Sequence, residues 1–583
     1  MATKKKLLQA AAGNAGGGGA GLNVEDVFST YLYTGTGSAQ TITNGIDLDG
    51  EGGLVWQKGR DLAYDHQLTD TERGVNKTIS TVNTAAESTK QSVSQFNSDG
   101  FLVGTEGDTN ANSRTYTSWT FRKAPKFFDI VTYTGNGTAG RTVSHNLGSV
   151  PGFIIFKQID DGRSWSIYHR GLNGGSSPED FVLVFDRDAQ SDFDGFLNDT
   201  APTATEFTVG NWTGINDSGG NYIAYLFAHN DGDGEFGPDS DQDIIKCGSF
   251  TDNGSLTTVN LGFEPQWLLV KKTNSSGSWE LLDNMRGLPA NSNVRTPLLF
   301  PNTSAAESYT YKQATSDSTG FTWKSGQLSS TNDTLIYVAI RARDGNVVAE
   351  PETATDAFDV SVSSGSTGTA VSTGFPVDMQ IQSKRSAPLS VVLSRKQNLI
   401  SITGTAAANA GLTMRYLQTA STSAALTNEE GQFGQLYNNT GFSIGSSYSG
   451  ASTAYYSFKR ARGWFDVVAY TGEGTKQTIS HNLGVAPEMM WIKVRSAPQH
   501  WTVYHPDLPG SGKNISLNNN WDGNNTNSNF WDGETPTSTT FSVGATGVNN
   551  LYVNGSGNTY IAYLFATLAG ISKVGSVTHS GTT

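Results

Sequence analysis

One stretch of this sequence occurs twice in similar form. Residues 128–157 read FDIVTYTGNGTAGRTVSHNLGSVPGFIIFK, and residues 465–493 read FDVVAYTGEGTKQTISHNLGVAPEMMWIK. The likeness continues downstream, where NYIAYLFA (221–228) recurs as TYIAYLFA (559–566). Such a repeat predicts a tandem array of one structural unit, and it indicates more about architecture than about chemistry.

Weaker relatives of the same pattern predict five units behind an N-terminal segment. The expected boundaries are 1–23 for a docking peptide and glycine-rich tether, 24–124 for unit 1, 125–230 for unit 2, 231–348 for an acidic connector and unit 3, 349–462 for a divergent unit 4, and 463–569 for unit 5. Residues 570–583 resemble the opening of a unit, as a comparison with 246–254 indicates. We therefore expect the start of a sixth unit there, or a C-terminal strand that pairs with a neighbour.

Each unit carries short runs rich in Val, Ile, Thr, Tyr and Phe, separated by Gly, Asn, Asp and Ser. This pattern is typical of antiparallel β-sandwiches, so the predicted fold class is all-β. The last run of a unit, such as 222–228, is apolar on both faces, which predicts a central strand between two sheets. The TGNG and TGEG segments are expected to turn the opening hairpin of a unit, since glycine accepts positive φ. Short helices are expected only in connections, for example near 84–94.

Composition excludes several classes of protein. A chain of 583 residues is too long for one core, so several domains are expected. A formal net charge of −14 argues against a nucleic-acid partner, which needs a basic surface. A single cysteine, Cys247, rules out an intrachain disulfide framework. No apolar run approaches the roughly 20 residues of a membrane helix.

The N-terminus, MATKKKLLQAAAGNAGGGGAGLN, imitates a signal peptide, but Gln9 interrupts its short apolar patch. We interpret it as a short helix followed by a flexible glycine tether. A short helix on such a tether is suited to docking into a larger assembly. The residues expected to dock are Lys4, Lys5, Lys6, Leu7 and Leu8.

The connector between units 2 and 3 crowds six carboxylates into 13 residues without a lysine or arginine. Several carboxylates on a flexible loop suit Ca²⁺, although the 12-residue loop of an EF-hand is not matched, because no Glu closes it. The alternatives are a structural Ca²⁺ site and a solvated acidic linker. The proposed ligands are Asp231, Asp233, Glu235, Asp239 and Asp241, with Asp243 next to them.

A second repeated constellation is Trp-x-x-Tyr-His, which contains Trp165 and Tyr168 in one copy and Trp501 and Tyr504 in the other. Aromatic faces stack on sugars, and their polar tips add hydrogen bonds, so these four residues are candidate carbohydrate contacts. The alternative is that they belong to the sandwich core.

No catalytic constellation is found. A glycosidase needs two carboxylates flanking a sugar, and no predicted strand shows Glu-x-Asp. The chain also lacks a G-x-S-x-G elbow and the Lys-Ser/Thr of a P-loop. His145 and His481, in SHNLG, lie in turn contexts without metal-ligand spacing. We therefore expect that the chain is not an enzyme.

Long phrases of residues 24–583 resemble a family of large virion proteins of marine tailed bacteriophages, especially cyanophages. They are usually described as tail-fibre-like or concanavalin A-like lectin/glucanase proteins. The phrases are LYTGTGSAQTITNGIDLDGEGGLVWQKGRD (32–61), YTSWTFRKAPKFFDIVTYTGNGTAGRTVSHNLGSVPGFII (116–155), YIAYLFAHNDGDGEFGPDSDQDIIKCGSF (222–250), LGFEPQWLLVKK (261–272) and GFPVDMQI (374–381). The resemblance implies concanavalin A-like or jelly-roll sandwiches and a structural part of a phage particle.

From this resemblance we expect a tail fibre or fibre-like appendage that contributes to host attachment and is made in the host cytoplasm. Its expected partners are other virion proteins, through residues 1–23, and copies of itself, with a trimer favoured because fibres are commonly trimers. The alternatives are a carbohydrate-binding adhesin for host surface polysaccharide and a head, neck or baseplate accessory protein; a depolymerase is not favoured. We expect no nucleic acid and no membrane insertion.

Overall fold

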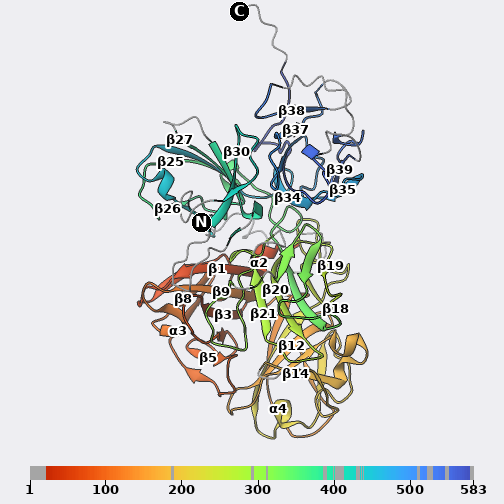
Figure 1. Ribbon diagram of the computed structural model, residues 1–583. Coiled ribbons are helices and arrows are strands. Elements are labelled where there is room, and N and C mark those ends of the chain that lie inside the picture. Colours follow the sequence, from red (N-terminus) through yellow and green to blue (C-terminus); the bar gives the residue numbers. More distant parts are fainter. Residues whose placement is uncertain are drawn as a thin grey trace, which may run out of the picture.

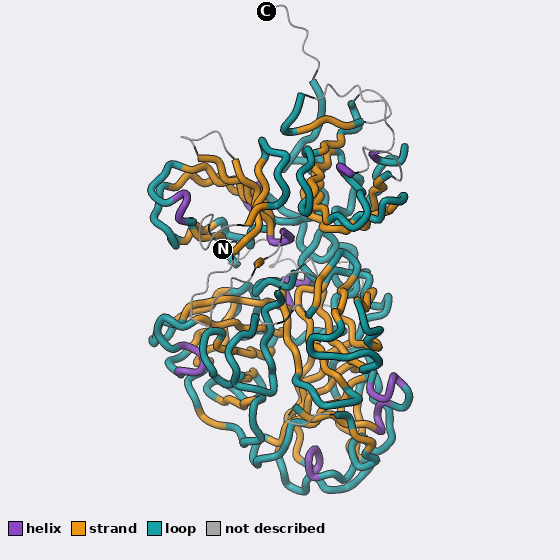
Figure 2. Tube along the Cα trace, in the orientation of Figure 1, coloured by secondary structure: helices purple, strands orange, loops and turns teal. Residues whose placement is uncertain are grey.

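The structure is a computed structural model, and it describes residues 21–185, 189–289, 295–309, 311, 313–384, 390–397, 399–400, 413–427, 434, 436, 439–508, 513–520, 530–544 and 551–577. Strands dominate, and the few helices are single turns (Figure 2). Every strand pair within the sheets is antiparallel, and the sheets form repeated sandwich-like units. No helix among the described residues is long and apolar enough to cross a membrane.

Units 1 and 2 follow each other along the chain. Unit 1 comprises α2 (Val24–Val27), β1 (Phe28–Thr34), β2 (Gln40–Thr43), β3 (Gly53–Gly59), β4 (Gln67–Asp70), β5 (Lys77–Ser80), β6 (Ser88–Thr89), β7 (Val93–Asn97), β8 (Gly100–Val103), α3 (Gly107–Asn110) and β9 (Thr115–Arg122). Unit 2 comprises β10 (Phe128–Thr134), β11 (Arg141–Ser144), β12 (Pro151–Gln158), β13 (Ser166–His169), η1 (Leu172–Gly175), η2 (Pro178–Asp180), β14 (Phe181–Val184), β15 (Ser191–Asp192), β16 (Glu206–Val209), α4 (Thr213–Asn216) and β17 (Asn221–Ala228).

Units 3, 4 and 5 use the same plan. Unit 3 comprises β18 (Ile245–Thr251), β19 (Leu256–Asn260), β20 (Pro265–Lys272), β21 (Trp279–Asp283), β22 (Ala314–Ser316), β23 (Gly320–Lys324) and β24 (Thr334–Arg341). Unit 4 comprises η3 (Ala354–Asp356), β25 (Phe358–Ser363), β26 (Ala370–Ser372), β27 (Met379–Lys384), β28 (Ser390–Ser394), η4 (Arg395–Gln397), β29 (Leu399–Ile400), β30 (Thr413–Gln418), β31 (Leu426–Thr427), β32 (Gly441–Ser443), η5 (Ser446–Tyr448) and β33 (Thr453–Phe458). Unit 5 comprises β34 (Phe465–Thr471), β35 (Gln477–Ser480), β36 (Met489–Val494), β37 (Thr502–Tyr504), β38 (Asn514–Ser516), β39 (Thr540–Val543) and β40 (Thr559–Phe565).

Each unit pairs a large sheet with a small one. The large sheets run β1-β9-β3-β4-β5-β6, β10-β17-β12-β13-β14-β15, β18-β24-β20-β21, β25-β33-β27-β28-β30-β29 and β34-β40-β36-β37-β38. The small sheets are β2-β8-β7, β11-β16, β19-β23-β22, β26-β32 and β35-β39. In every unit the first strand pairs with the last strand, so a unit is closed only when its whole sequence has folded.

The predicted opening hairpin is wrong. β10 pairs with β17 in the large sheet, whereas β11 pairs with β16 in the small sheet, so the TGNG segment crosses between sheets. The crossover packs on the loop before β17: the amide of Asn136 donates to Asn216 Oδ1 at 2.9 Å, and a side chain at Gly135 would meet the carbonyl of Asp217. Gly137 has a φ of 69°, in the region that favours glycine.

The same crossover recurs in units 1 and 5. Buried Asn110 and Asn554 accept hydrogen bonds from the amides of Thr36 and Glu473, each at 2.9 Å. The helix expected near 84–94 is also wrong, because this segment contains β6 and begins β7. His145 and His481 do serve turns, as predicted: their Nδ1 atoms accept hydrogen bonds from the amides of Leu147 and Leu483.

The large sheets of units 1, 2 and 3 bury both faces, which explains the apolar patterns of their last strands. One face covers the small sheet of the same unit, and the other packs against neighbouring units. Units 1, 2 and 3 form one body and units 4 and 5 a second (Figure 1). In the first body the outer faces meet in an aromatic layer, where the ring of Phe121 lies 5.4 Å from Phe227 and 5.8 Å from Trp267.

Replacement of Phe121 by alanine tests this layer. The side chain is fully buried and touches rings from all three units, so we expect the free energy of unfolding to fall by about 3–5 kcal/mol. Leu256→Ala, at an exposed position on β19, is the control and should change it by less than about 0.5 kcal/mol. Urea denaturation followed by tryptophan fluorescence measures both, and an equal effect of the two variants would contradict the shared layer.

Candidate functional site

The four aromatic residues predicted to contact carbohydrate lie in the core. Trp165, Tyr168, Trp501 and Tyr504 are each at most 3% exposed. The two tryptophans form equivalent hydrogen bonds to the preceding unit. Trp165 Nε1 donates to the carbonyl of Ser80 in unit 1, and Trp501 Nε1 donates to the carbonyl of Gln418 in unit 4. The structure thus places the two tryptophans in contacts between units, and all four side chains are buried.

A buried lysine makes the same junction beside each tryptophan. Lys157 Nζ donates to Thr84 O at 3.1 Å, and Lys493 Nζ donates to Thr422 O at 3.0 Å. A backbone hydrogen bond completes both sets, from Glu87 N to Ile159 O at 2.8 Å and from Ala425 N to Arg495 O at 2.9 Å. The interface between units 4 and 5 therefore repeats these three hydrogen bonds of the interface between units 1 and 2.

The ends of three equivalent strands close a ring in the first body. At the end of β4, Asp70 accepts a hydrogen bond from Tyr225 Oη of unit 2 at 2.7 Å. At the end of β13, His169 Nε2 donates to the carbonyl of Tyr337 in unit 3 at 3.0 Å. The ring closes at the end of β21, where Asp283 accepts from Trp119 Nε1 of unit 1 at 3.0 Å.

We call these strand ends the corners of the units. Two corners share the spacing Asp-x-x-Arg, in Asp70–Arg73 and Asp283–Arg286, and each pair forms a buried ion pair of 2.6 Å. Sequence reasoning missed them, although the repeated spacing was available as a signal. The corners join units 1→2→3→1, so no unit of this body is bound on one side only.

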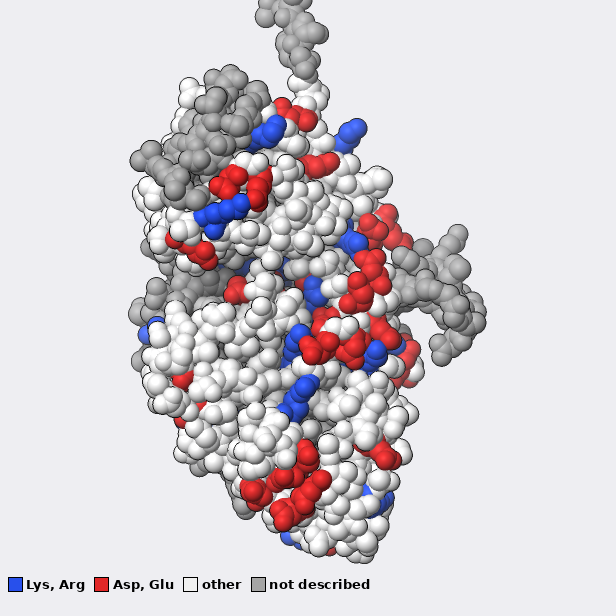
Figure 3. All heavy atoms as spheres, turned by 90° about the vertical axis from the view of Figure 1, so that its right-hand side faces the viewer, with Lys and Arg blue, Asp and Glu red and all other residues white. Residues whose placement is uncertain are grey.

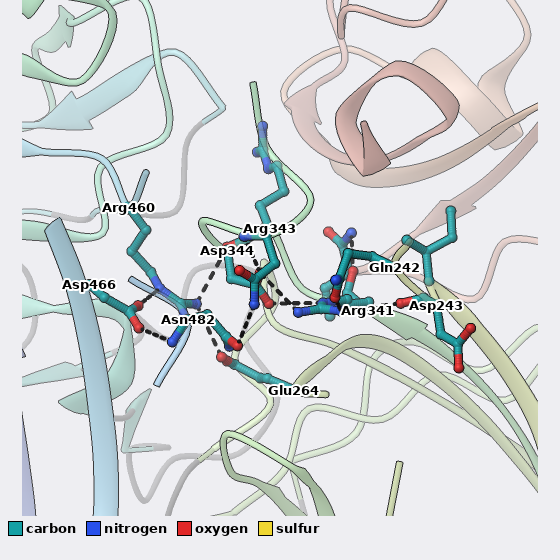
Figure 4. Close-up of polar contacts among 12 residues, drawn as sticks. Gln242, Asp243, Glu264, Arg341, Arg343, Asp344, Arg460, Asp466 and Asn482 are labelled. Carbon is teal, nitrogen blue, oxygen red and sulfur yellow. Dashed lines mark hydrogen bonds and ion pairs between the residues drawn. The ribbon is translucent and has the colours of Figure 1, made fainter. Parts of the chain in front are cut away.

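A polar cluster joins the two bodies (Figure 4). Arg460, in the link between units 4 and 5, lies at its centre: Nε donates to Asp466 Oδ1 at 2.6 Å and Nη1 donates to Glu264 Oε2 of unit 3 at 3.1 Å. Lys396 also contacts Glu264. We call this cluster the joint. A cavity of about 60 Å³ under it has room for only a few water molecules, so side chains fill the joint themselves.

Further contacts extend the joint to the connector and to unit 5. Arg341 pairs with Asp344 at 3.0 Å and donates to Gln242 Oε1 at 2.8 Å, while Asn346 Nδ2 donates to Asn482 Oδ1 at 3.1 Å. Burial raises the pKa of Asp466, but Arg460 and the amide of Asn482 outweigh it and hold this pKa below its usual value. Asp466 is therefore ionised and paired at neutral pH.

Several of the connector carboxylates are paired with cations from outside the connector. Lys126 Nζ lies 2.8 Å from Glu235 Oε1, Lys246 Nζ lies 3.6 Å from Asp243 Oδ2, and Arg462 contacts Asp239. In the part of the chain that the structure describes, no three His, Cys, Asp or Glu side chains are grouped to hold a metal ion. Asp231 also lies within 3.7 Å of Lys246 Nζ. Figure 3 shows acidic and basic side chains next to one another on one side of the molecule, and the calcium site stays a prediction.

One groove brings two groups of predicted site residues together. It has a volume of about 680 Å³, within the roughly 300–1,000 Å³ of ligand pockets. Tyr168, Arg170 and His229 line it together with Asp231 and Asp233 of the connector. Burial, with a smaller effect of Arg170, lowers the pKa of His229 to about 4, so its ring is neutral at pH 7. The groove thus offers a charged guanidinium, a neutral imidazole and carboxylates to a polar ligand.

The docking residues Lys4, Lys5, Lys6, Leu7 and Leu8 lie outside the described residues. Cys247 is a buried thiol whose pKa burial raises, so it is not poised as a nucleophile.

These features define an all-β protein of repeated sandwich-like units that are tied into two bodies. The chain belongs to the family described as domain of unknown function (DUF7483), whose profile matches residues 23–343 and 438–583. The first matched stretch covers the three-unit body, and the second covers unit 5 together with the end of unit 4. No curated protein matches the chain.

Replacement of Arg460 by alanine tests the joint. It leaves the buried carboxylates of Glu264 and Asp466 without their common partner, so we expect a loss of about 3–5 kcal/mol in the free energy of unfolding. The control Lys476→Ala removes an exposed, solvent-screened pair with Asp532 and should lower the free energy of unfolding much less than Arg460→Ala. Chemical denaturation compares the two variants, and equal costs would mean that the joint does not stabilise the chain.

The pH dependence of stability tests the buried lysine. Burial lowers the pKa of Lys493 to about 8, against roughly 10.4 in an unfolded chain. Between these values the folded chain binds fewer protons than the unfolded chain, so this lysine makes stability rise with pH. Denaturation from pH 8 to 9.5 should therefore show a smaller rise for Lys493→Met than for the parent chain, whereas exposed Lys573→Met should follow the parent. Parallel curves for Lys493→Met and the parent would contradict the shift.

Proposed function

We propose that this chain is a structural component of a tailed-phage virion, a tail fibre or fibre-like appendage that contributes to host attachment. The observation that carries the proposal is that buried polar side chains form hydrogen bonds and ion pairs between units. The corner residues, the repeated Trp and Lys pairs and the joint all connect one sandwich to another. A chain whose buried charged groups hold its units together is suited to a structural role.

The resemblance to virion proteins of marine tailed phages supports the same proposal, and it adds the concanavalin A-like or jelly-roll identity of the sandwiches. In this role residues 1–23 dock into other virion proteins, and copies of the chain assemble with one another. The chain acts in the virion as an attachment part and not as an enzyme. A position in the head, neck or baseplate remains the nearest alternative within this class.

Deletion of residues 2–23 tests the docking role. We expect the shortened chain to be soluble and folded, with the circular dichroism of the parent, and to be missing from assembled particles. Immunoblotting of purified virions measures incorporation, and a full-length chain supplied in parallel is the control. Normal incorporation of the shortened chain would refute docking through this segment.

A second candidate function, carbohydrate binding, is favoured by the groove of unit 2. Its polar lining suits a sugar, whose hydroxyl groups both donate and accept hydrogen bonds. In this role the residues that contact the sugar are Arg170, His229 and Asp233, and not the buried tryptophans.

Arg170→Ala and its matched control, Arg163→Ala, test this function. Both arginines are surface residues of unit 2, but only Arg170 lines the groove. On an array of host surface polysaccharides we expect the parent chain and Arg163→Ala to bind and Arg170→Ala to lose at least about tenfold in affinity, equivalent to about 1.4 kcal/mol. An absence of binding by the parent chain would refute the adhesin role and leave the structural role standing.

A further inference from the structure

The second body leaves part of its large sheets uncovered. On unit 4 the outer face of β25 and β33 exposes Val360, Val362 and Tyr456 by 51%, 56% and 37%. In unit 5, Met489 and Trp491 on the outer face of β36 are only half-buried. Large apolar side chains gathered on one side of a sheet indicate an interaction surface. We call these five residues the open face.

The first body shows what covers the equivalent positions. Trp119 has the place in β9 that Tyr456 has in β33, because each pairs with the third residue of the first strand of its unit, Thr30 or Val360. The corner of unit 3 covers Trp119, which is completely buried. Phe153 has the place in β12 that Met489 has in β36, and its ring packs 6.1 Å from Trp279 of unit 3. In both cases the cover is another sandwich unit.

A corner is also left without its partner. His505 directly follows β37, in the place that His169 has at the end of β13, and in each case Nδ1 accepts a hydrogen bond from the amide two residues further along the chain. His169 Nε2 reaches the carbonyl of Tyr337 in the next unit, whereas His505 Nε2 has no hydrogen-bond partner among the described residues although it is shielded from solvent. Such an orphaned group costs about 1–3 kcal/mol unless a partner supplies an acceptor.

The second body thus has both halves of one interface. Unit 5 presents an unpaired corner, and unit 4 presents an uncovered last strand. The corner of one unit binds the last strand of the next in the first body, and Tyr455 of β33 has the place that Tyr337 has in β24. In one chain the two halves cannot meet, because units 4 and 5 already use their other sides against each other.

We propose that the open face binds a second copy of this chain, with unit 5 of each copy against unit 4 of the other. In two copies related by a two-fold axis, the corner of each unit 5 meets the last strand of unit 4 in the other copy, so the same contact forms twice, as expected for an isologous interface. The apolar side chains of β25, β33 and β36 are buried in this contact, and the carbonyl of Tyr455 in one copy accepts the hydrogen bond of His505 Nε2 from the other. The inference does not depend on the virion role, because it concerns the purified chain alone.

Sedimentation equilibrium of the full chain tests the proposal. We expect a concentration-dependent dimer whose dissociation constant rises at least about tenfold in Val362→Asp and in Tyr456→Asp, since a charge in an apolar contact is desolvated without a partner. Leu256→Asp, on β19 of unit 3 and 46% exposed, is the matched control and should leave the dissociation constant within about twofold. Circular dichroism confirms that each variant is folded, and the surface positions make this the expected result.

A parent chain that stays monomeric at all concentrations would overturn the proposal. So would an oligomer that Val362→Asp and Tyr456→Asp leave intact, because its contact would then lie elsewhere. Either result leaves the proposed virion role open to its own test, the incorporation of the chain shortened at its N-terminus.

Discussion

The packing of one large sheet against another is the interaction on which this structure depends. A sandwich that stood alone would bury only the inner face of its large sheet and expose the outer one. Here the outer faces are apolar as well, and Phe121, Phe227 and Trp267 meet from three units in one layer. Since the outer faces need each other, the five units form two bodies and not a string of independent beads.

Polar groups buried by this packing have their partners across the unit boundaries. Trp165, Lys157 and His169 of unit 2 donate to backbone carbonyls of units 1 and 3. Each of these bonds is available only when the neighbouring unit is folded and correctly placed. The apolar layer thus supplies most of the driving force, and the hydrogen bonds select one arrangement of the units.

Much of the secondary structure could be predicted from the sequence. The apolar run at 222–228 was predicted as a central strand, and β17 lies between β10 and β12 in the large sheet, while the repeat indicated that the strands belong to one kind of unit. The opening hairpin was predicted wrongly, because two strands joined by a glycine turn usually pair with each other, and nothing local reveals that β10 and β11 join different sheets. Trp165 and Trp501 were assigned two alternatives for a similar reason: a tryptophan on a strand looks the same in sequence whether it faces a sugar or a neighbouring unit.

The sequence by itself determined the repeated unit, its strands and their apolar faces, since these follow from side-chain periodicity within a few residues. Only the tertiary structure decided which faces meet and which charges pair. Arg460 is 196 residues from Glu264, and carboxylates of the connector pair with Lys126, Lys246 and Arg462, which lie outside it. Contacts of this kind depend on how whole sandwiches are oriented, and that orientation is fixed by sheet-to-sheet packing between residues far apart in the chain.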